Sequence, residues 1–447
     1  MKKKGLVWLV IICMAAGIGG CGKKEPAQSE VQNETENAAR DGERVQLSMD
    51  EETPKGGEIS ASREITAEEE ENMLRNGVNH FAYQLYGRLG SGENVFFSPY
   101  SLCSALSLLN LGAGTETKRE LETLLGISDM EVWSSAMKAY LETEWSDETF
   151  VLTANSIWLQ QGEEWAEHIE ADFLNPAAEF FKSELYEADF QGNPAEAIAK
   201  LNGWADKNTN GMIPEVITEL PPATVLVLMN AVYFEGKWEI PFVEESTHEE
   251  NFYGSDGEKR VDMMHQYGEY YAYIESCGMK GIAIPYKDSP LVMKIFVPLA
   301  PEGGEDIEAL FAALNDAERE ALLDSLDDAD EKEIDRLVIP KFTMEQEIKG
   351  LKEILQDMGM QEAFAETADF DKIAEGLYVS QVLHKAKIEV DEQGTKAAAV
   401  TAVAAAGCAM VEEKIPIIFE ADRPFIYVIQ DTRTGMILFM GRVSHLE

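Results

Sequence analysis

From residue 66 onward, apolar positions recur at the spacings of helices. Residues 66–69 (TAEE) match a capping box, which marks the start of a helix. Apolar residues then recur three or four positions apart, which predicts a helix ending near Gly90: Leu74, Val78, Phe81, Leu85 and Leu89. A second helix is predicted over 101–111, where residues 112–114 (GAG) end it.

Strand patterns follow in the second half of the chain. The apolar run 225–234, with Val, Tyr and Phe, predicts a strand buried on both faces. Shorter strands are predicted over 291–297 and 336–339, and residues 425–430 and 436–440 predict a terminal hairpin.

Acidic helices are predicted between these strands, over 305–324 and 348–358. Helices and strands mix without strict alternation, and neither a repeat nor a linker divides residues 72–447. We therefore expect one large α+β domain over 72–447.

The N-terminal residues have the pattern of an export signal. Lys2, Lys3 and Lys4 precede an apolar run over 6–18, which is shorter than the roughly 20 residues that span a bilayer. Residues 18–21 (IGGC) resemble a bacterial lipobox. We expect a lipoprotein-type signal peptide over 1–20, lipidation of Cys21, and a protein anchored at the bacterial surface or envelope. An uncleaved or conventionally cleaved signal is the alternative.

Residues 21–71 are expected to be a disordered acidic tether that begins with the lipidated Cys21. Large apolar residues are almost absent from 22–71, so burial cannot offset the entropy of ordering this segment. Most of the net charge of −45 lies outside the tether. This charge argues against nucleic-acid binding and against adsorption to anionic lipid through a basic patch.

The sequence lacks the common catalytic and metal-binding motifs. CxxC, HExxH, GxSxG and GxxxxGK[ST] are absent, and one GxGxxG match over 17–22 follows no strand. His248, His265 and His384 show no ligand spacing, so we interpret them as structural. We expect no enzyme activity, no metal and no cofactor.

Residues 394–409 (GTKAAAVTAVAAAGCA) combine small side chains with a single charge, Lys396. A helix or an Ala-rich linker is one interpretation. Alternation supports another, a strand with one small, uncharged face: Thr395, Ala397, Ala399, Thr401, Val403 and Ala405.

Ordered blocks along the chain resemble the serpin family. The segment 94–101 (NVFFSPYS), followed by 111–113 (LGA), is similar to its N-V-x-x-S-P-x-S signature, and 230–238 (NAVYFEGKW) is similar to its N-x-x-Y-F-x-G-x-W block. The later blocks keep the family's order: 339–342 (IPKF), 384–386 (HKA), 392–399 (EQGTKAAA), 421–425 (ADRPF) and 439–443 (FMGRV).

The resemblance implies a large mixed β-sheet, further sheets and an exposed reactive-centre loop over about 392–420. It also implies suicide inhibition, in which a serine protease, or in some cases a cysteine protease, cleaves the loop. The loop then inserts into the sheet and traps the acyl-enzyme. A non-inhibitory serpin acting as a surface binding or carrier module is the alternative. A surface adhesion or scaffolding lipoprotein is a third interpretation.

Site residues follow from the resemblance by position. The loop hinge corresponds to Glu392, Gly394, Thr395, Ala397, Ala398 and Ala399. A polar cluster beneath the opening sheet corresponds to Ser98, Ser101, Asn230 and His384, with ordinary core packing as the alternative. Trp238 resembles the residue under the point where insertion begins.

Loop length places the reactive bond at Cys408–Ala409, with Gly407 and Met410 as alternatives in the register. No Lys or Arg lies between Lys396 and Lys414, so elastase-, subtilisin- or chymotrypsin-like targets are favoured over trypsin-like ones. Oxidation of an exposed Cys408 would switch inhibition off. Cys103 and Cys277 are expected to be buried free thiols, and the native state is expected to be monomeric.

Overall fold

The computed structural model describes residues 66–162, 169, 171–300, 304–395 and 415–447. The chain divides into two units, Met1–Ala38 and Ala39–Glu447, and all described residues belong to the second. None of the described helices is both long enough and apolar enough to cross a membrane.

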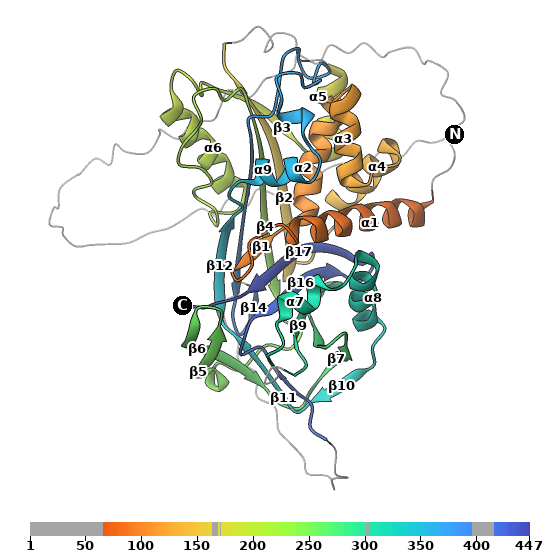
Figure 1. Ribbon diagram of the computed structural model, residues 1–447, viewed down its shortest axis with the longest axis vertical. Coiled ribbons are helices and arrows are strands. Elements are labelled where there is room, and N and C mark those ends of the chain that lie inside the picture. The colour runs from red at the N-terminus through yellow and green to blue at the C-terminus, as the bar shows by residue number, and fades with distance from the viewer. Residues whose placement is uncertain (1–65, 163–168, 170, 301–303, 396–414) are drawn as a thin grey trace, which may run out of the picture. The chain divides into compact units, whose positions relative to one another are not determined.

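One of the three sheets in the described chain has six strands (Figure 1). Its order is β12 (Phe342–Glu347), β13 (Gln381–Val390), β14 (Gly394–Thr395), β4 (Leu226–Lys237), β2 (Thr149–Gln160) and β3 (Glu184–Ala188). The predicted strand over 225–234 is confirmed as β4, whose first nine residues are all buried. A strand in the middle of a sheet with both faces covered requires this continuous apolar run.

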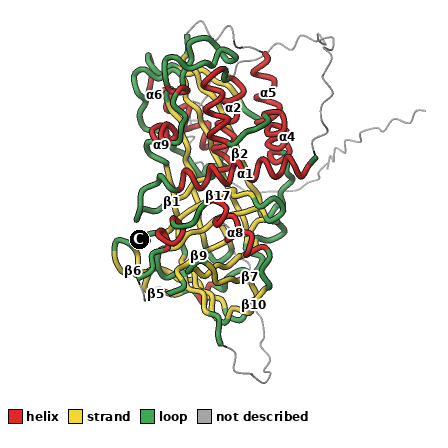
Figure 2. Tube along the Cα trace, turned by 45° about the vertical axis from the view of Figure 1, so that its right-hand side comes forward, coloured by secondary structure: helices red, strands yellow, loops and turns green. Residues whose placement is uncertain are grey.

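Two helices, α2 (Pro99–Gly112) and α6 (Pro194–Asn208), lie on opposite faces of this sheet (Figure 2). Leu201 and Trp204 of α6 pack with Val227 and Met229 of β4, while Leu228 of β4 faces the main core. The predicted helix over 101–111 is confirmed as α2. It begins earlier because Ser98 caps it and Pro99 takes the first turn.

A second sheet has seven strands in the order β1 (Val95–Phe97), β17 (Met436–Val443), β16 (Phe425–Asp431), β9 (Leu291–Pro298), β8 (Met279–Pro285), β7 (Glu269–Ser276) and β10 (Glu331–Ile334). The predicted terminal hairpin is confirmed as β16 and β17, which pair antiparallel. The third sheet has the order β15 (Ile418–Glu420), β11 (Arg336–Pro340), β6 (Gly257–Gln266) and β5 (His248–Gly254). The expected α+β class is confirmed.

The first helix, α1 (Ala67–Tyr86), begins at the predicted capping box, in which Thr66 and Glu69 cap each other. The predicted helix over 305–324 is instead two helices, α7 (Ile307–Ala312) and α8 (Asp316–Asp327). Asn315 forms its own capping box with Glu318, which starts a new helix there. The remaining elements are α3 (Thr115–Leu125), α4 (Met130–Leu141), α5 (Ala171–Phe181), α9 (Leu351–Asp357), η2 (Glu244–Ser246) and η4 (Glu362–Phe364).

The two cysteines of the described chain differ in environment. Cys103 in α2 is a buried free thiol, as predicted. Cys277 is free but exposed, so that prediction is wrong. Strand β7 ends at Ser276, and the turn takes Cys277 to a φ of 51°, outside the sheet.

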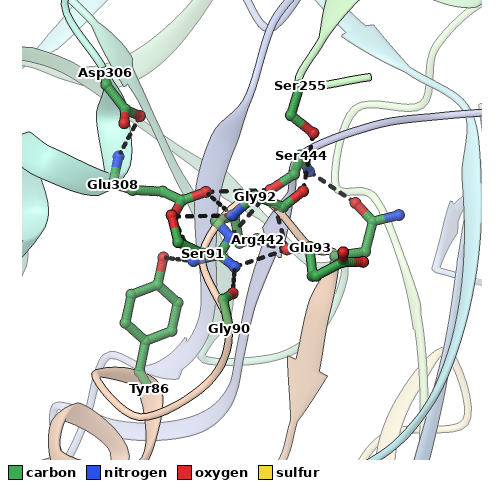
Figure 3. A network of polar contacts seen from close by, with 11 residues as sticks. Tyr86, Gly90, Ser91, Gly92, Glu93, Ser255, Asp306, Glu308, Arg442 and Ser444 are labelled. Carbon is green, nitrogen blue, oxygen red and sulfur yellow. Dashed lines mark hydrogen bonds and ion pairs between the residues drawn. The ribbon is translucent and has the colours of Figure 1, made fainter.

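Arg442 of β17 ties the end of the chain to the loop after α1 (Figure 3). Its side chain is almost fully buried and forms an ion pair with Glu308 of α7, with 3.1 Å between Nη1 and Oε2. Its Nε and Nη2 donate to the carbonyl of Glu93 at 3.0 and 2.8 Å. Three segments far apart in sequence therefore depend on one guanidinium.

We predict that Arg442→Met lowers the free energy of unfolding by about 3 kcal/mol, because it removes the charged partner of the largely buried carboxylate of Glu308 and two donors to the carbonyl of Glu93. Urea unfolding followed by tryptophan fluorescence measures this. Arg119→Met is the matched control, since Arg119 pairs with Glu116 at the exposed surface, and its midpoint should stay at the wild-type value. Equal midpoints for both variants would contradict the assignment.

Candidate functional site

The candidate site is the seam between strands β13 and β4. These strands pair in parallel from Gln381 with Val227 to Lys385 with Ala231. Beyond that pairing, β14 lies between them, with Thr395 opposite Val390 of β13 and Gly236 of β4. The seam is therefore closed at one end and held open by one short strand at the other.

A buried polar cluster lies under the closed end of the seam. Asn230 and His384 are cross-strand partners, and His384 Nδ1 lies 2.9 Å from Asn230 Oδ1. Ser101 of α2 donates its hydroxyl to the same Oδ1 at 2.8 Å. The backbone N–H of Ser98 donates to His384 Nε2 at 3.2 Å, so the ring proton lies on Nδ1 and is donated to Asn230. The four residues predicted to form this cluster do lie together, and all are buried.

Two further residues extend the cluster and were not anticipated from the sequence. Asn230 Nδ2 donates to Asn155 Oδ1 of β2 at 2.8 Å, and Asn155 Nδ2 donates to the hydroxyl of Ser104 in α2 at 2.8 Å. Ser104 lies one helical turn beyond Ser101 and so shares its face, which is the one sequence signal that indicates it.

The hinge preceding the loop is held by contacts on both sides. Glu392 forms an ion pair with Lys341 at 2.9 Å, and its carbonyl accepts from Phe242 N at 2.7 Å. Burial is the largest single influence on the pKa of Glu392 and raises it, but the bonds from Lys341 and Thr247, a backbone bond and the charge of Lys341 together outweigh it, so the net pKa is lowered. Trp238 donates its indole N–H to the carbonyl of Asp391 at 3.0 Å, directly beneath the hinge.

Strand β14 itself is fitted tightly into the seam. The hydroxyls of Thr395 and Tyr286 lie 2.8 Å apart, both buried, and Tyr286 stacks on Trp238 with centroids 4.8 Å apart. At Gly394 a Cβ would lie 2.1 Å from the carbonyl oxygen of Gly236, so only glycine fits there.

The other predicted site residues lie outside the described residues: Cys21, Ala397, Ala398, Ala399, Gly407, Cys408, Ala409 and Met410. The described chain resumes before β15, which pairs with β11 in the four-stranded sheet. The segment 396–414 thus connects the six-stranded sheet to a different sheet.

This combination of three sheets, a seam and a hinge matches one protein family. A family model described as "Serpin (serine protease inhibitor)" matches residues 76–446. The chain is 37% identical over 389 residues to an uncharacterized serpin-like protein of Thermococcus kodakarensis, covering 86% of this chain and 88% of that one.

Two solved structures extend the comparison. The native state of the thermophilic serpin tengpin has a TM-score of 0.75 at 28% identity, with 87% of this chain and 96% of that chain covered. Human thyroxine-binding globulin has a TM-score of 0.72 at 26% identity, with 84% and 99% covered. The chain belongs to the serpin family, whose members are in general protease inhibitors and not enzymes.

Burial lowers the pKa of His384 from 6.5 to about 3. Between pH 6.5 and pH 3, the His384 ring is therefore protonated more readily in the unfolded chain than in the folded chain. We predict that His384 contributes a loss of native stability as pH falls from 6.5 toward 3, at most about 1.4 kcal/mol per pH unit.

Chemical unfolding across this pH range checks the prediction. His384→Gln keeps one donor and one acceptor but does not titrate, so its stability should fall less steeply than that of the wild type. Parallel curves for wild type and His384→Gln would refute the role of this ring.

Proposed function

We propose that this serpin inhibits serine proteases by suicide inhibition, with the seam between β13 and β4 receiving the cleaved loop. The observation that carries the proposal is β14. The hinge already occupies the first position of an additional strand, antiparallel to both neighbours. If the strand continued beyond Thr395, it would have to separate β13 from β4 and break their residue pairs one after another.

The register of β14 specifies where each loop residue would go. Thr395 lies opposite Gly236, so each later residue meets one earlier residue on β4. Ala397 would meet Phe234, Ala399 would meet Val232, and Thr401 would meet Asn230. The pairing with β13 gives the same result, since it places Thr401 opposite His384.

Side-chain size and charge support this register. Residues two apart in a strand share a face, so Ala397, Ala399 and Thr401 would follow Thr395 toward the core. All are small, as a packed interior requires. Lys396 would point to the other face, opposite Glu235 and Glu389, where two carboxylates would offset its charge.

The polar cluster supports a gating role. Insertion would break the 2.9 Å contact between His384 and Asn230, because the new strand would run between them. A buried polar group that loses its partner costs about 1–3 kcal/mol. The hydroxyl of Thr401 would arrive at that level of the seam and would replace the lost partner.

The covalent step uses ordinary acyl transfer. The protease serine Oγ attacks the carbonyl carbon of Cys408 and loses its proton to the protease's own base. An ester forms, the Cys408–Ala409 bond breaks, and the amine of Ala409 leaves with a proton. Gly407 and Met410 remain the alternatives in register, and cysteine proteases would form the corresponding thioester.

We further propose the setting and the partners. The lipobox-like residues 18–21 support lipidation at Cys21 and attachment at the bacterial surface, and we propose that the protein is monomeric there. The uncharged residues around Cys408 support elastase-, subtilisin- or chymotrypsin-like targets.

A carrier function is the second candidate, favoured by the likeness to thyroxine-binding globulin, which was solved with its ligand. The small, uncharged inserting face favours inhibition over it.

Mixing the full-length protein with an elastase, subtilisin and chymotrypsin tests the function. We predict a covalent complex on denaturing gels at the summed mass less that of a released peptide that begins at Ala409. A peptide that begins at Cys408 or Met410 would support the same mechanism with the cleaved bond one residue earlier or later. Proteases that cut the loop and remain free and active would overturn the proposal and support the carrier.

Insertion itself is tested by Thr401→Arg, which would bury an unpaired charge against Asn230 and His384. We predict that the protein becomes a substrate, with the ratio of inhibitor consumed to protease trapped rising about tenfold or more, since each 1.4 kcal/mol in the competing barriers is tenfold. Lys396→Arg keeps its charge on the opposite face and is the matched control. Equal ratios in the two variants would exclude this register.

A further inference from the structure

Three ligand-type side chains come together on the four-stranded sheet. His248 and Glu250 share one face of β5, and His265 lies on the same face of β6, diagonally across the pairing. Glu250 Oε1 lies 3.0 Å from His248 Nε2 and 3.3 Å from His265 Nε2. All three ligand atoms lie within 4.8 Å of one another, the one such group in the described part of the chain.

The hydrogen bond at His248 Nδ1 leaves Nε2, the nitrogen that faces Glu250, without a proton when the ring is neutral. His248 Nδ1 lies 3.0 Å from the carbonyl oxygen of Ser246. A carbonyl only accepts, so Nδ1 carries the proton and Nε2 presents a lone pair toward Glu250. Two acceptors 3.0 Å apart repel each other unless a cation or a further proton lies between them.

The inner nitrogen of His265 gives an independent indication. This side chain is 2% exposed, and its buried Nε2 lies 3.3 Å from Glu250 Oε1 without forming a hydrogen bond of good geometry. Its Nδ1 lies 3.2 Å from the hydroxyl of Tyr267, which holds the ring with Nε2 facing Glu250. An ion between this nitrogen and the carboxylate would satisfy both groups, as buried polar groups require.

We propose that His248, Glu250 and His265 bind one divalent transition-metal ion of the Zn²⁺ class. Two imidazoles and a carboxylate are a known zinc donor set, in which water takes the fourth position. The separations of 3.0 and 3.3 Å from Glu250 Oε1 to the two ring nitrogens suit a tetrahedral ion with bonds of about 2.0–2.2 Å, and the two ring nitrogens lie within 4.8 Å of each other. The Ser246 carbonyl and the Tyr267 hydroxyl support the outer nitrogens, as partners of metal-binding histidines usually do.

Two local features bear on whether a cation can bind here: the stacking of the two histidine rings and the nearby charge of Arg336. The rings of His248 and His265 stack with centroids 4.3 Å apart, so one ring must tilt to aim both lone pairs at one ion. His248 is the mobile partner, because its side chain is 53% exposed. Arg336 on β11 is the nearby positive charge, and its ion pair with Glu420 offsets it.

Zinc titration of the tag-free, full-length protein tests the proposal, with a chromophoric chelator as competitor. We predict one zinc equivalent bound by this cluster. His248→Ala and Glu250→Gln should each weaken that binding about tenfold or more. Without metal, both variants should melt at the same temperature as the metal-free wild type, because both positions are at the surface.

His80→Ala is the matched control, since His80 and Asp316 form a histidine–carboxylate pair at 2.8 Å without a third ligand. It should leave zinc affinity unchanged. Absence of zinc binding by the wild type, or unchanged affinity in His248→Ala and Glu250→Gln, would overturn the proposal and leave a hydrogen-bonded cluster. Neither result depends on protease inhibition.

Discussion

The hydrogen bond between His384 and Asn230 is the interaction on which the seam depends. It joins the two central strands where no strand separates them. Ser98, which caps α2, and Ser101 of α2 hydrogen-bond to these two side chains. These groups are buried, so the strands cannot part there without a cost of about 1–3 kcal/mol for each polar group left unpaired. The seam is therefore closed where β13 pairs directly with β4, although β14 separates the same two strands at Thr395.

The hinge is restrained by charge and by shape. The ion pair between Lys341 and Glu392 connects the hinge to the chain between β11 and β12. Trp238, directly after β4, donates a hydrogen bond to the hinge. Gly394 passes so close to Gly236 that a side chain there would exclude β14. The seam between β13 and β4 already contains β14 at one end, so further residues of the same loop could extend β14 into the closed part.

Much of this fold could be predicted from sequence where the signal was local. The capping box at Thr66, the apolar run of β4 and the terminal hairpin are each encoded by neighbouring residues. Family motifs indicated Ser98, Ser101, Asn230 and His384, but Asn155 joins them only through the pairing of β2 with β4. His248 and His265 meet diagonally across two strands, a relation that linear spacing does not show. Cys277 was misassigned because one turn residue decides its exposure.

A crystal structure of the protein cleaved in its loop tests the central claim most directly. The account predicts a new strand between β13 and β4, with the Thr401 hydroxyl within hydrogen-bonding distance of Asn230 or His384. The direct pairing of His384 with Asn230 would then be absent. A cleaved protein that keeps this pairing, with β14 no longer than in the uncleaved chain, would contradict the account.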